Sequence, residues 1–291
     1  ELVEFNQVLE DKNTWRDDFI TSFGVKGVVA LSWWLGSLFA EQIRARYMNY
    51  PFIEITGAAG AGKSTLLEFL WKLIGRAQYE GFNPTNSTRA GRSRMFNQVS
   101  NLPIVFIEGD TATENNRSKQ GGNWIEETKP LYNGRSDRVT GQKNMGNQTN
   151  EVPFRGALVI SQNAQIQAST AVLSRIIYIH FDKSHHSPVT RQSAQRIERL
   201  DVEEVSGFLL HAITHEESIL KLIDQSYEEY RNEVMNIPGI ETERVGHNHA
   251  ILLSLLDALC KLINIDDATR KKTRDFIMTI AYQREQDLKR D

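Results

Sequence analysis

The feature that most constrains the fold of this chain is a glycine-rich loop set between a strand-like stretch and a helix-like stretch. The segment PFIEIT (51–56) alternates like a short strand, GAAGAGKST (57–65) follows it, and LLEFLWKLIG (66–75) has apolar residues at helical spacing. The loop fits the pattern G-x-x-x-x-G-K-[ST] without a gap, in the setting that this pattern requires. Such a loop binds phosphate, because glycines let backbone N–H groups surround the anion and the following helix adds partial positive charge.

The motif assigns a separate contact to each of its polar residues. We expect the Lys63 ammonium to neutralise the β- and γ-phosphate oxygens of ATP and the Ser64 hydroxyl to ligate Mg²⁺, with Thr65 as a secondary contact. The predicted nucleotide-binding residues are Gly57, Ala58, Ala59, Gly60, Ala61, Gly62, Lys63, Ser64 and Thr65.

Three further apolar stretches predict strands buried on both faces, as in a parallel sheet. They are LPIVFIEGD (102–110), GALVISQNA (156–164) and SRIIYIHF (174–181). Residues 1–50 and nearly everything after Pro188 have helical patterns instead. We therefore predict an α/β fold, a P-loop core with a central parallel sheet flanked by helices. Its parts are an N-terminal helical segment (1–50), the P-loop core (51–184) and a C-terminal helical subdomain (185–291).

Two acids come at the end of the first of these stretches. Hydrolysis needs a carboxylate that holds the water shell of the metal and polarises an attacking water, and Glu108 and Asp110 are placed to supply it. We favour Glu108 as the base and as a second metal ligand. Asp110 stays open as the base, because Gly109 separates the two acids. The alternative is that both acids merely end a strand and face solvent.

Two polar residues accompany the later strands. Asn163 ends the stretch ALVISQN, where its amide could hold the lytic water or the γ-phosphate, although asparagine there is more commonly a turn former. Arg175 stands at the entrance of the stretch IIYIHF, and we predict that it reaches the γ-phosphate of a neighbouring subunit as an arginine finger. A surface ion pair is the alternative for Arg175.

The interval Lys129–Gly156 favours a basic hairpin. Two turn-forming clusters, NGRSD and GQKNMGNQ, flank the strand-like RVT. We predict that Lys143 lies at the tip, with Arg135 and Arg138 below it, and that these side chains contact a nucleic-acid backbone. The net charge of the chain is −3, so any such contact must be local. A solvated polar loop is the alternative.

Taken in order, these motifs resemble the superfamily 3 helicases of the AAA+ class, in particular the helicase part of phage, plasmid and viral primase-helicases. The likeness covers about residues 52–182 and rests most on the hairpin and on VISQN. It implies an ATP-driven hexameric ring that threads single-stranded or forked DNA, with Asn163 as a polar sensor and Arg175 as a finger acting in trans. It also implies a primase domain elsewhere in the full-length protein.

Other classes of function remain open. An AAA+ remodeller or loader would grip a polypeptide with the hairpin, but the hairpin lacks an obvious aromatic or hydrophobic grip residue. A nucleotide-gated scaffold would bind ATP without turnover, which the acids and Asn163 argue against. The apolar run Val28–Ala40 is too short to span a bilayer. Together with the single cysteine, Cys260, it favours a reducing, cytoplasmic setting in a bacterium or host cell.

Overall fold

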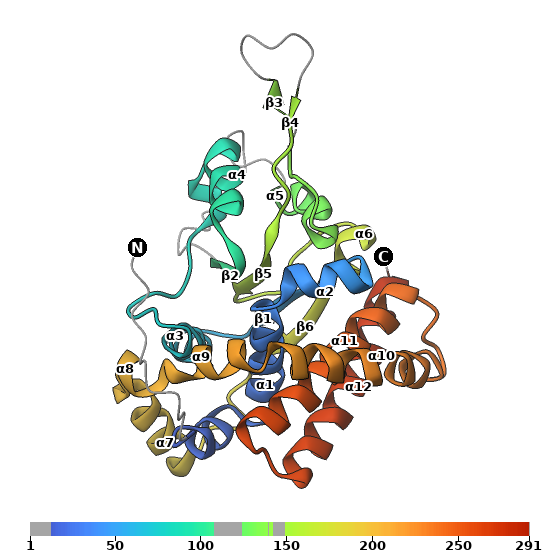
Figure 1. The fold of residues 1–291 in the computed structure, drawn as a ribbon. Helices are drawn as coiled ribbons and strands as arrows, with labels where there is room; N and C mark the ends of the chain where they lie inside the picture. The colour runs from blue at the N-terminus through green and yellow to red at the C-terminus, as the bar shows by residue number, and fades with distance from the viewer. Residues whose placement is uncertain (1–12, 108–123, 139, 142–148, 291) are drawn as a thin grey trace.

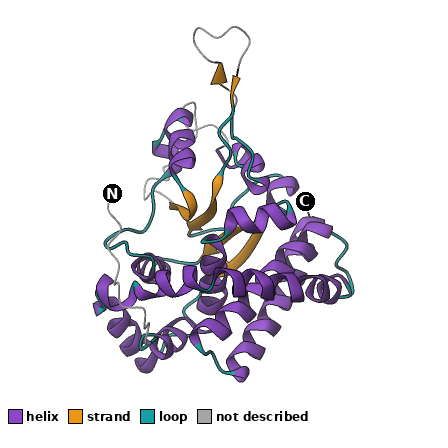
Figure 2. Cartoon of the chain, in the orientation of Figure 1, coloured by secondary structure: helices purple, strands orange, loops and turns teal. Residues whose placement is uncertain are grey.

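The computed structural model describes residues 13–107, 124–138, 140–141 and 149–290. Strands lie at the centre and helices surround them (Figures 1 and 2). In chain order, the elements are α1 (Arg16–Ser37), α2 (Ala40–Tyr47), β1 (Phe52–Thr56), α3 (Lys63–Leu73), the 3-10 helix η1 (Pro84–Asn86), α4 (Arg89–Gln98), β2 (Ser100–Ile107), α5 (Trp124–Glu127), the 3-10 helix η3 (Lys129–Asn133), β3 (Thr140–Gly141), β4 (Thr149–Asn150), β5 (Arg155–Gln162), α6 (Thr170–Leu173), β6 (Ile176–His180), α7 (Pro188–Arg199), α8 (Val202–Val205), α9 (Gly207–Thr214), α10 (Glu216–Met235), α11 (Glu243–Ile263) and α12 (Asp267–Arg290).

Four of the strands form one parallel sheet in the order β2-β5-β1-β6. Ile53 of the central strand β1 pairs with Val159 of β5 on one side and with Ile177 of β6 on the other. All five residues of β1 are buried, as expected of a parallel strand covered on both faces. The predicted α/β fold with a central parallel sheet flanked by helices is therefore confirmed.

Because the strands are parallel, the sheet has two chemically different edges. The chain leaves the strands at one edge, which carries the glycine-rich loop after β1 and Asn163 after β5; we call it the P-loop edge. The chain enters the strands at the other edge, where Arg175 precedes β6; we call it the entry edge. The five residues of β1 separate the two edges by roughly 16 Å, at about 3.3 Å per residue.

Helix α1 carries most of the apolar run Val28–Ala40 and is buried on nearly all sides from Gly27 to Ser37. It packs against α7, α11 and α12. By length and composition α1 could cross a membrane, but 67% of its most apolar part is buried inside the protein. That burial is typical of a core helix, and it accounts for the lack of a polar face along α1.

Apolar side chains join all three predicted parts of the chain. One cluster includes Trp34 of α1, Leu67 of α3 and Leu255 of α11. A smaller cluster covers the other face of the sheet and includes Phe52 and Tyr132. The boundaries that the sequence predicts after residues 50 and 184 stay predictions, since the larger cluster crosses both of them.

The short strands β3 and β4 form the hairpin that the sequence predicts within 129–156. They pair antiparallel, with Thr140 opposite Asn150 and Gly141 opposite Thr149. In Figure 1 this pair projects at the top, away from the sheet and from the C-terminal helices. Lys143, which we predict at the hairpin tip, lies outside the described residues.

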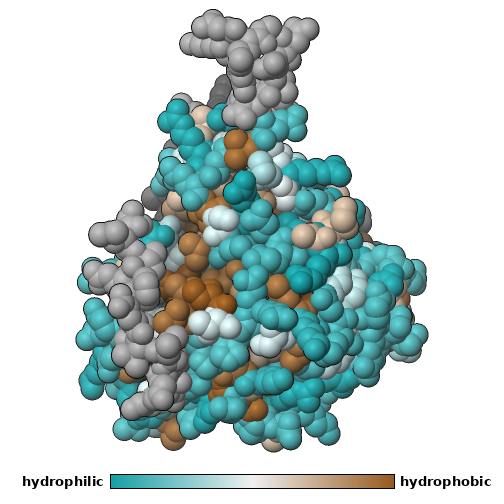
Figure 3. All heavy atoms as spheres, in the orientation of Figure 1, coloured by the Kyte–Doolittle hydropathy of each residue, from teal (hydrophilic) through white to brown (hydrophobic). Residues whose placement is uncertain are grey.

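The surface is mostly hydrophilic on the face shown in Figure 3, with apolar side chains gathered near its centre, where α3 and the sheet lie in Figure 1. Among the described residues, four large apolar side chains are exposed: Met48, Val189, Ile213 and Tyr282. They come from separate elements, and single exposed apolar residues of this kind are normal for a folded chain.

Candidate functional site

The glycine-rich loop is held tightly against the end of β6. A Cβ atom added to Gly57 would lie 2.2 Å from the carbonyl oxygen of Phe181, so no larger residue fits there. Gly62, the last residue before α3, has φ of 93°, a left-handed conformation that side chains rarely adopt. The backbone at both positions therefore requires the glycines that the motif specifies.

Lys63 and Asn163 meet at the P-loop edge although 100 residues separate them in the chain. The Lys63 ammonium donates to the Asn163 side-chain oxygen at 3.2 Å, and also to the carbonyl oxygens of Gly57 and Ala58. The structure thus brings together two of the residues that the sequence singled out, and their roles in binding and catalysis stay predictions.

The hydroxyls that follow Lys63 are bonded to carboxylates. Ser64 Oγ donates to Glu80 Oε1 at 2.9 Å, and Thr65 Oγ1 donates to Glu198 Oε1 of α7 at 3.0 Å. Sequence reasoning did not find Glu80, because no strand end or motif marks it. A carboxylate beside the Ser64 hydroxyl is the kind of oxygen ligand that Mg²⁺ prefers.

Glu80 reaches Ser64 because the segment around it is hydrogen-bonded to β2, an outermost strand of the sheet. Phe82 N donates to the Val105 carbonyl at 3.0 Å, and Ile107 N donates to the Phe82 carbonyl at 2.9 Å, which makes an isolated parallel bridge beside β2. The backbone after α3 is thereby held next to the start of the same helix.

Glu108 and Asp110, the predicted acids, lie outside the described residues. The strand before them, β2, ends at Ile107, which pairs with Ser161 of β5. The chain therefore leaves β2 at the P-loop edge. Ser161, the partner of the last residue of β2, is two residues before Asn163. Their roles as base and metal ligand stay predictions.

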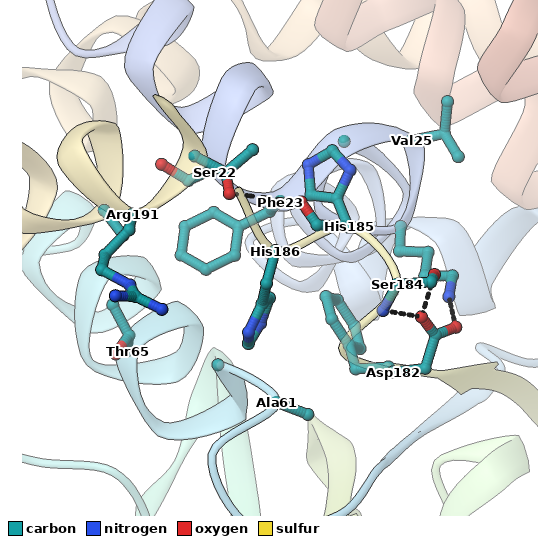
Figure 4. Close-up of a pocket in the computed structure, with 16 residues that line it drawn as sticks. Ser22, Phe23, Val25, Ala61, Thr65, Asp182, Ser184, His185, His186 and Arg191 are labelled. Atoms are coloured by element: carbon teal, nitrogen blue, oxygen red, sulfur yellow. Dashed lines mark hydrogen bonds and ion pairs between the residues drawn. The ribbon is translucent and has the colours of Figure 1, made fainter. Parts of the chain in front are cut away.

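A cavity of about 370 Å³ opens beside the glycine-rich loop (Figure 4). One wall is α1 at Gly24, where the helix is interrupted by a non-helical residue with φ of 57°. Phe23, His186 and Arg191 surround the same space, next to Ala61 of the loop. A cavity of this size, part aromatic and part polar, suits a small ligand that extends from the phosphate loop.

Charged groups line the rim of this cavity. Asp182 accepts a hydrogen bond from the Lys26 ammonium at 2.8 Å and another from the Ser184 amide at 2.7 Å. These bonds, the one from Lys26 above all, lower the pKa of Asp182 well below its usual range. The Lys183 ammonium lies over the loop itself, 3.6 Å from where a Cβ of Gly60 would be. No motif in the sequence marks Lys183.

Arg175 lies at the entry edge, away from the phosphate loop of its own chain. Its guanidinium carbon is 5.5 Å from the centre of the Tyr132 ring, and Nη1 donates to the Ala171 carbonyl. Burial, followed by the nearby charge of Arg244, lowers the pKa of Arg175. An arginine side chain is shorter than the roughly 16 Å between the two edges, so Arg175 cannot reach the cradle of its own subunit.

The predicted nucleic-acid contacts share a groove with Arg175. A groove of about 610 Å³ at the base of the hairpin is lined by Arg135, Arg138, Arg175 and Lys129, with Asp137 and Glu151 as the two acids. The sequence predicts contact with nucleic acid for Arg135 and Arg138, and the role of an arginine finger for Arg175. The structure brings all three to one surface, at the entry edge.

Comparison with solved structures shows a shared fold. The structure entitled "SCCmec type IV Cch - active helicase" matches 94% of this chain with a TM-score of 0.63 at 13% sequence identity. This chain spans about half of that protein, 51% of its length. The JCV helicase matches 94% of this chain and 72% of its own length at 14% identity, but its TM-score of 0.35 is too low to argue from.

No protein-family model and no curated protein sequence matches the chain. At 13% identity, the likeness to the Cch helicase shows the fold and nothing about activity. Together with the glycine-rich loop at the carboxyl end of β1, it leads to one conclusion. The chain has an α/β P-loop fold with a central parallel sheet, which it shares with the Cch helicase structure.

Proposed function

We propose that this protein is an ATP-dependent nucleic-acid motor, a ring-forming DNA helicase of the superfamily 3 type that acts in the replication of a phage or mobile element. The observation that carries the proposal is the meeting of Lys63 and Asn163 beside a cavity at the P-loop edge. A phosphate cradle with a polar side chain opposite its lysine suits a site that distinguishes ATP from ADP and turns ATP over.

The residues at this edge fit ATP with Mg²⁺. Gly57 leaves no room for a side chain, and Gly60 and Gly62 have left-handed backbone conformations that side chains rarely adopt. Helix α3 begins at Lys63, so its N-terminus points at the loop. When bound, Mg²⁺ would supply positive charge that stabilises the negative charge developing on the phosphate. Ser64 would hold the metal, with Glu108 as predicted or with Glu80, the carboxylate that contacts Ser64 in the structure. The cavity beside Phe23 would take the nucleoside.

In the reaction that we propose, each residue has one task. The Lys63 ammonium gives up its hydrogen bonds to carbonyl oxygens of its own loop and binds phosphate oxygens of ATP instead. Asn163 orients the attacking water, and Glu108 or Asp110 accepts its proton. Arg175 of a neighbouring subunit stabilises charge on the transferred group, since it is too far from the cradle of its own chain.

The hairpin is the part that we propose to contact DNA. It projects from the body, and the groove at its base has four cationic and two acidic side chains. Lys143 at the tip, with Arg135 and Arg138 below, would bind the phosphates of single-stranded or forked DNA in a hexameric ring. A primase domain elsewhere in the full-length protein would fit this role.

One measurement tests the proposal: the rate of ATP hydrolysis with and without single-stranded DNA, for the wild type and for Lys143→Ala. We expect DNA to stimulate the wild type and to leave the variant unstimulated. Hydrolysis that ignores DNA in both proteins would support a remodeller that acts on polypeptide. ATP binding without hydrolysis would support a scaffold, and either result would reject the motor.

A further inference from the structure

The middle of β1 contains a buried carboxylate that the proposed reaction does not use. Glu54 is 0% exposed, and it lies two residues before Thr56, the last residue of β1 ahead of the glycine-rich loop. Its side chain is on the same face of the sheet as Tyr178 of β6, with which it is in register. A charged group in this position is costly unless hydrogen bonds and an opposite charge compensate it.

Both hydrogen bonds of Glu54 go to the loop that carries Asn163. Glu54 Oε1 accepts from Gln162 Nε2 at 2.9 Å and from the Ile166 backbone amide at 2.6 Å. Gln162 precedes Asn163 directly, and Ile166 follows it by three residues. A single carboxylate oxygen therefore fixes both ends of the 162–166 loop.

The opposite charge comes from the C-terminal helix α12. Arg284 Nη2 lies 3.9 Å from Glu54 Oε2, and the Arg284 side chain is 1% exposed. The guanidinium carbon is 5.3 Å from the centre of the Tyr178 ring. Within the described part of the chain, the three guanidinium nitrogens have no hydrogen-bond partner, so Glu54 is the main compensation for this buried cation.

We propose that Glu54 is a positioning residue, which sets the side-chain oxygen of Asn163 against Lys63, and that Arg284 connects α12 to this arrangement. Lys63 must leave its own loop carbonyls when phosphate enters, and its contact with Asn163 must change with it. The bonds from Glu54 would keep the backbone of the Asn163 loop in place meanwhile. This inference rests on the proposed function, because it assumes that Asn163 senses the γ-phosphate.

Three variants test whether Glu54 positions Asn163 or only stabilises the fold. Glu54→Leu removes the acceptor oxygen and leaves Arg284 as an unpaired buried cation, so we expect both stability and turnover to fall. Glu54→Leu with Arg284→Met removes both charges, and this should return the melting temperature close to that of the wild type. Glu54→Gln keeps an acceptor oxygen for Gln162 and Ile166.

The readouts are turnover, KM for ATP, and the relative affinity for a non-hydrolysable ATP analogue and ADP. For the double variant we expect kcat to stay roughly 10- to 100-fold below the wild type, because a shift of about 1 Å in a positioned group costs on that order. KM should change less than about threefold, and the preference for the ATP analogue over ADP should fall. Glu54→Gln should keep kcat within about threefold of the wild type.

A matched control uses an ion pair that α12 makes with α11 instead of with β1. Arg270 Nε of α12 bonds Asp257 of α11 at 2.6 Å, and Asp257→Leu with Arg270→Met should leave kcat and the nucleotide preference unchanged. The inference is wrong if the Glu54→Leu/Arg284→Met protein regains wild-type turnover, or if Glu54→Gln loses as much as Glu54→Leu. A wild type that hydrolyses no ATP would reject the proposed function instead, and the analogue-to-ADP preference would still decide on Glu54.

Discussion

The two edges of the sheet are built in opposite ways. At the P-loop edge, side chains from distant segments already contact one another, Lys63 with Asn163 and Ser64 with Glu80. At the entry edge, cations outnumber acids in the groove below the hairpin, and Nε of Arg175 is buried without a hydrogen-bond partner among the described residues. Polar groups that satisfy each other form a site within one molecule, whereas surplus positive charge on an open groove attracts an anionic partner.

The largest effect that we expect is at the P-loop edge. Lys63→Ala should lower ATP turnover by at least about 1,000-fold and weaken nucleotide binding, because the cradle loses the charge that faces the phosphates. Radiolabelled ATP hydrolysis and calorimetric binding measure the two effects. Lys72→Ala is the control on the same helix, since Lys72 bonds the carbonyls of Glu198 and Leu200 instead. Equal losses in both variants would show damage to α3 and would remove the assignment.

The next largest effect should show whether Arg175 at the entry edge acts on the nucleotide site of a neighbouring subunit. Arg175→Ala should lower turnover on the order of 1,000-fold and leave ATP binding within about threefold. An equal mixture of Arg175→Ala and Lys63→Ala proteins should regain about a quarter of wild-type turnover, because one interface in four would hold both intact residues. A mixture that stays inactive would contradict an action in trans.

A smaller effect should show whether Arg138, in the groove below the hairpin, binds DNA or a neighbouring subunit. Arg138→Ala should weaken binding of single-stranded DNA by about tenfold and lower the slope of log affinity against log salt by about 1, if its guanidinium binds one phosphate. Fluorescence anisotropy over a range of salt concentrations measures both quantities. An unchanged slope together with a loss of turnover would place Arg138 at the subunit interface beside Arg175.

The smallest expected effect concerns Glu80. Glu80→Gln should raise the Mg²⁺ concentration for half-maximal turnover by about two- to fivefold, if this carboxylate supports the metal that Ser64 holds. Titration of ATPase activity with Mg²⁺ tests the direction of the change. A lower requirement in the variant would mean that Glu80 competes with the metal for the Ser64 hydroxyl.

The sheet could be predicted from the sequence because each of its strands is a short apolar stretch that can be recognised locally. PFIEIT and the three later apolar runs form the four parallel strands, and the turn-rich interval 129–156 contains the hairpin. From sequence, Lys63 was predicted to bind the phosphates of ATP and Asn163 to hold the γ-phosphate or the lytic water, and the parallel strands bring them to one edge. These inferences need only periodicity and direction of the chain.

Contacts made by residues outside any motif could not be predicted. Glu80 is beside Ser64 only because Phe82 pairs with the edge of β2, and Glu54 is compensated only because α12 returns across the sheet. Arg175 and Arg138 were predicted for separate tasks, and their common groove depends on how η3 packs below the hairpin. Tertiary packing decides each of these, and it has no signature in a single sequence.

Helix α1, although interrupted at Gly24, contributes both a wall of the cavity beside the glycine-rich loop and the buried stretch from Gly27 to Ser37. Backbone amides beyond Gly27 should exchange slowly with solvent, because this part of α1 is buried and the helix packs against α7, α11 and α12. Occupancy of the cavity should therefore slow hydrogen exchange deep in the helical body, far from any phosphate. Each round of nucleotide binding and release would alternately stiffen and relax the whole subunit.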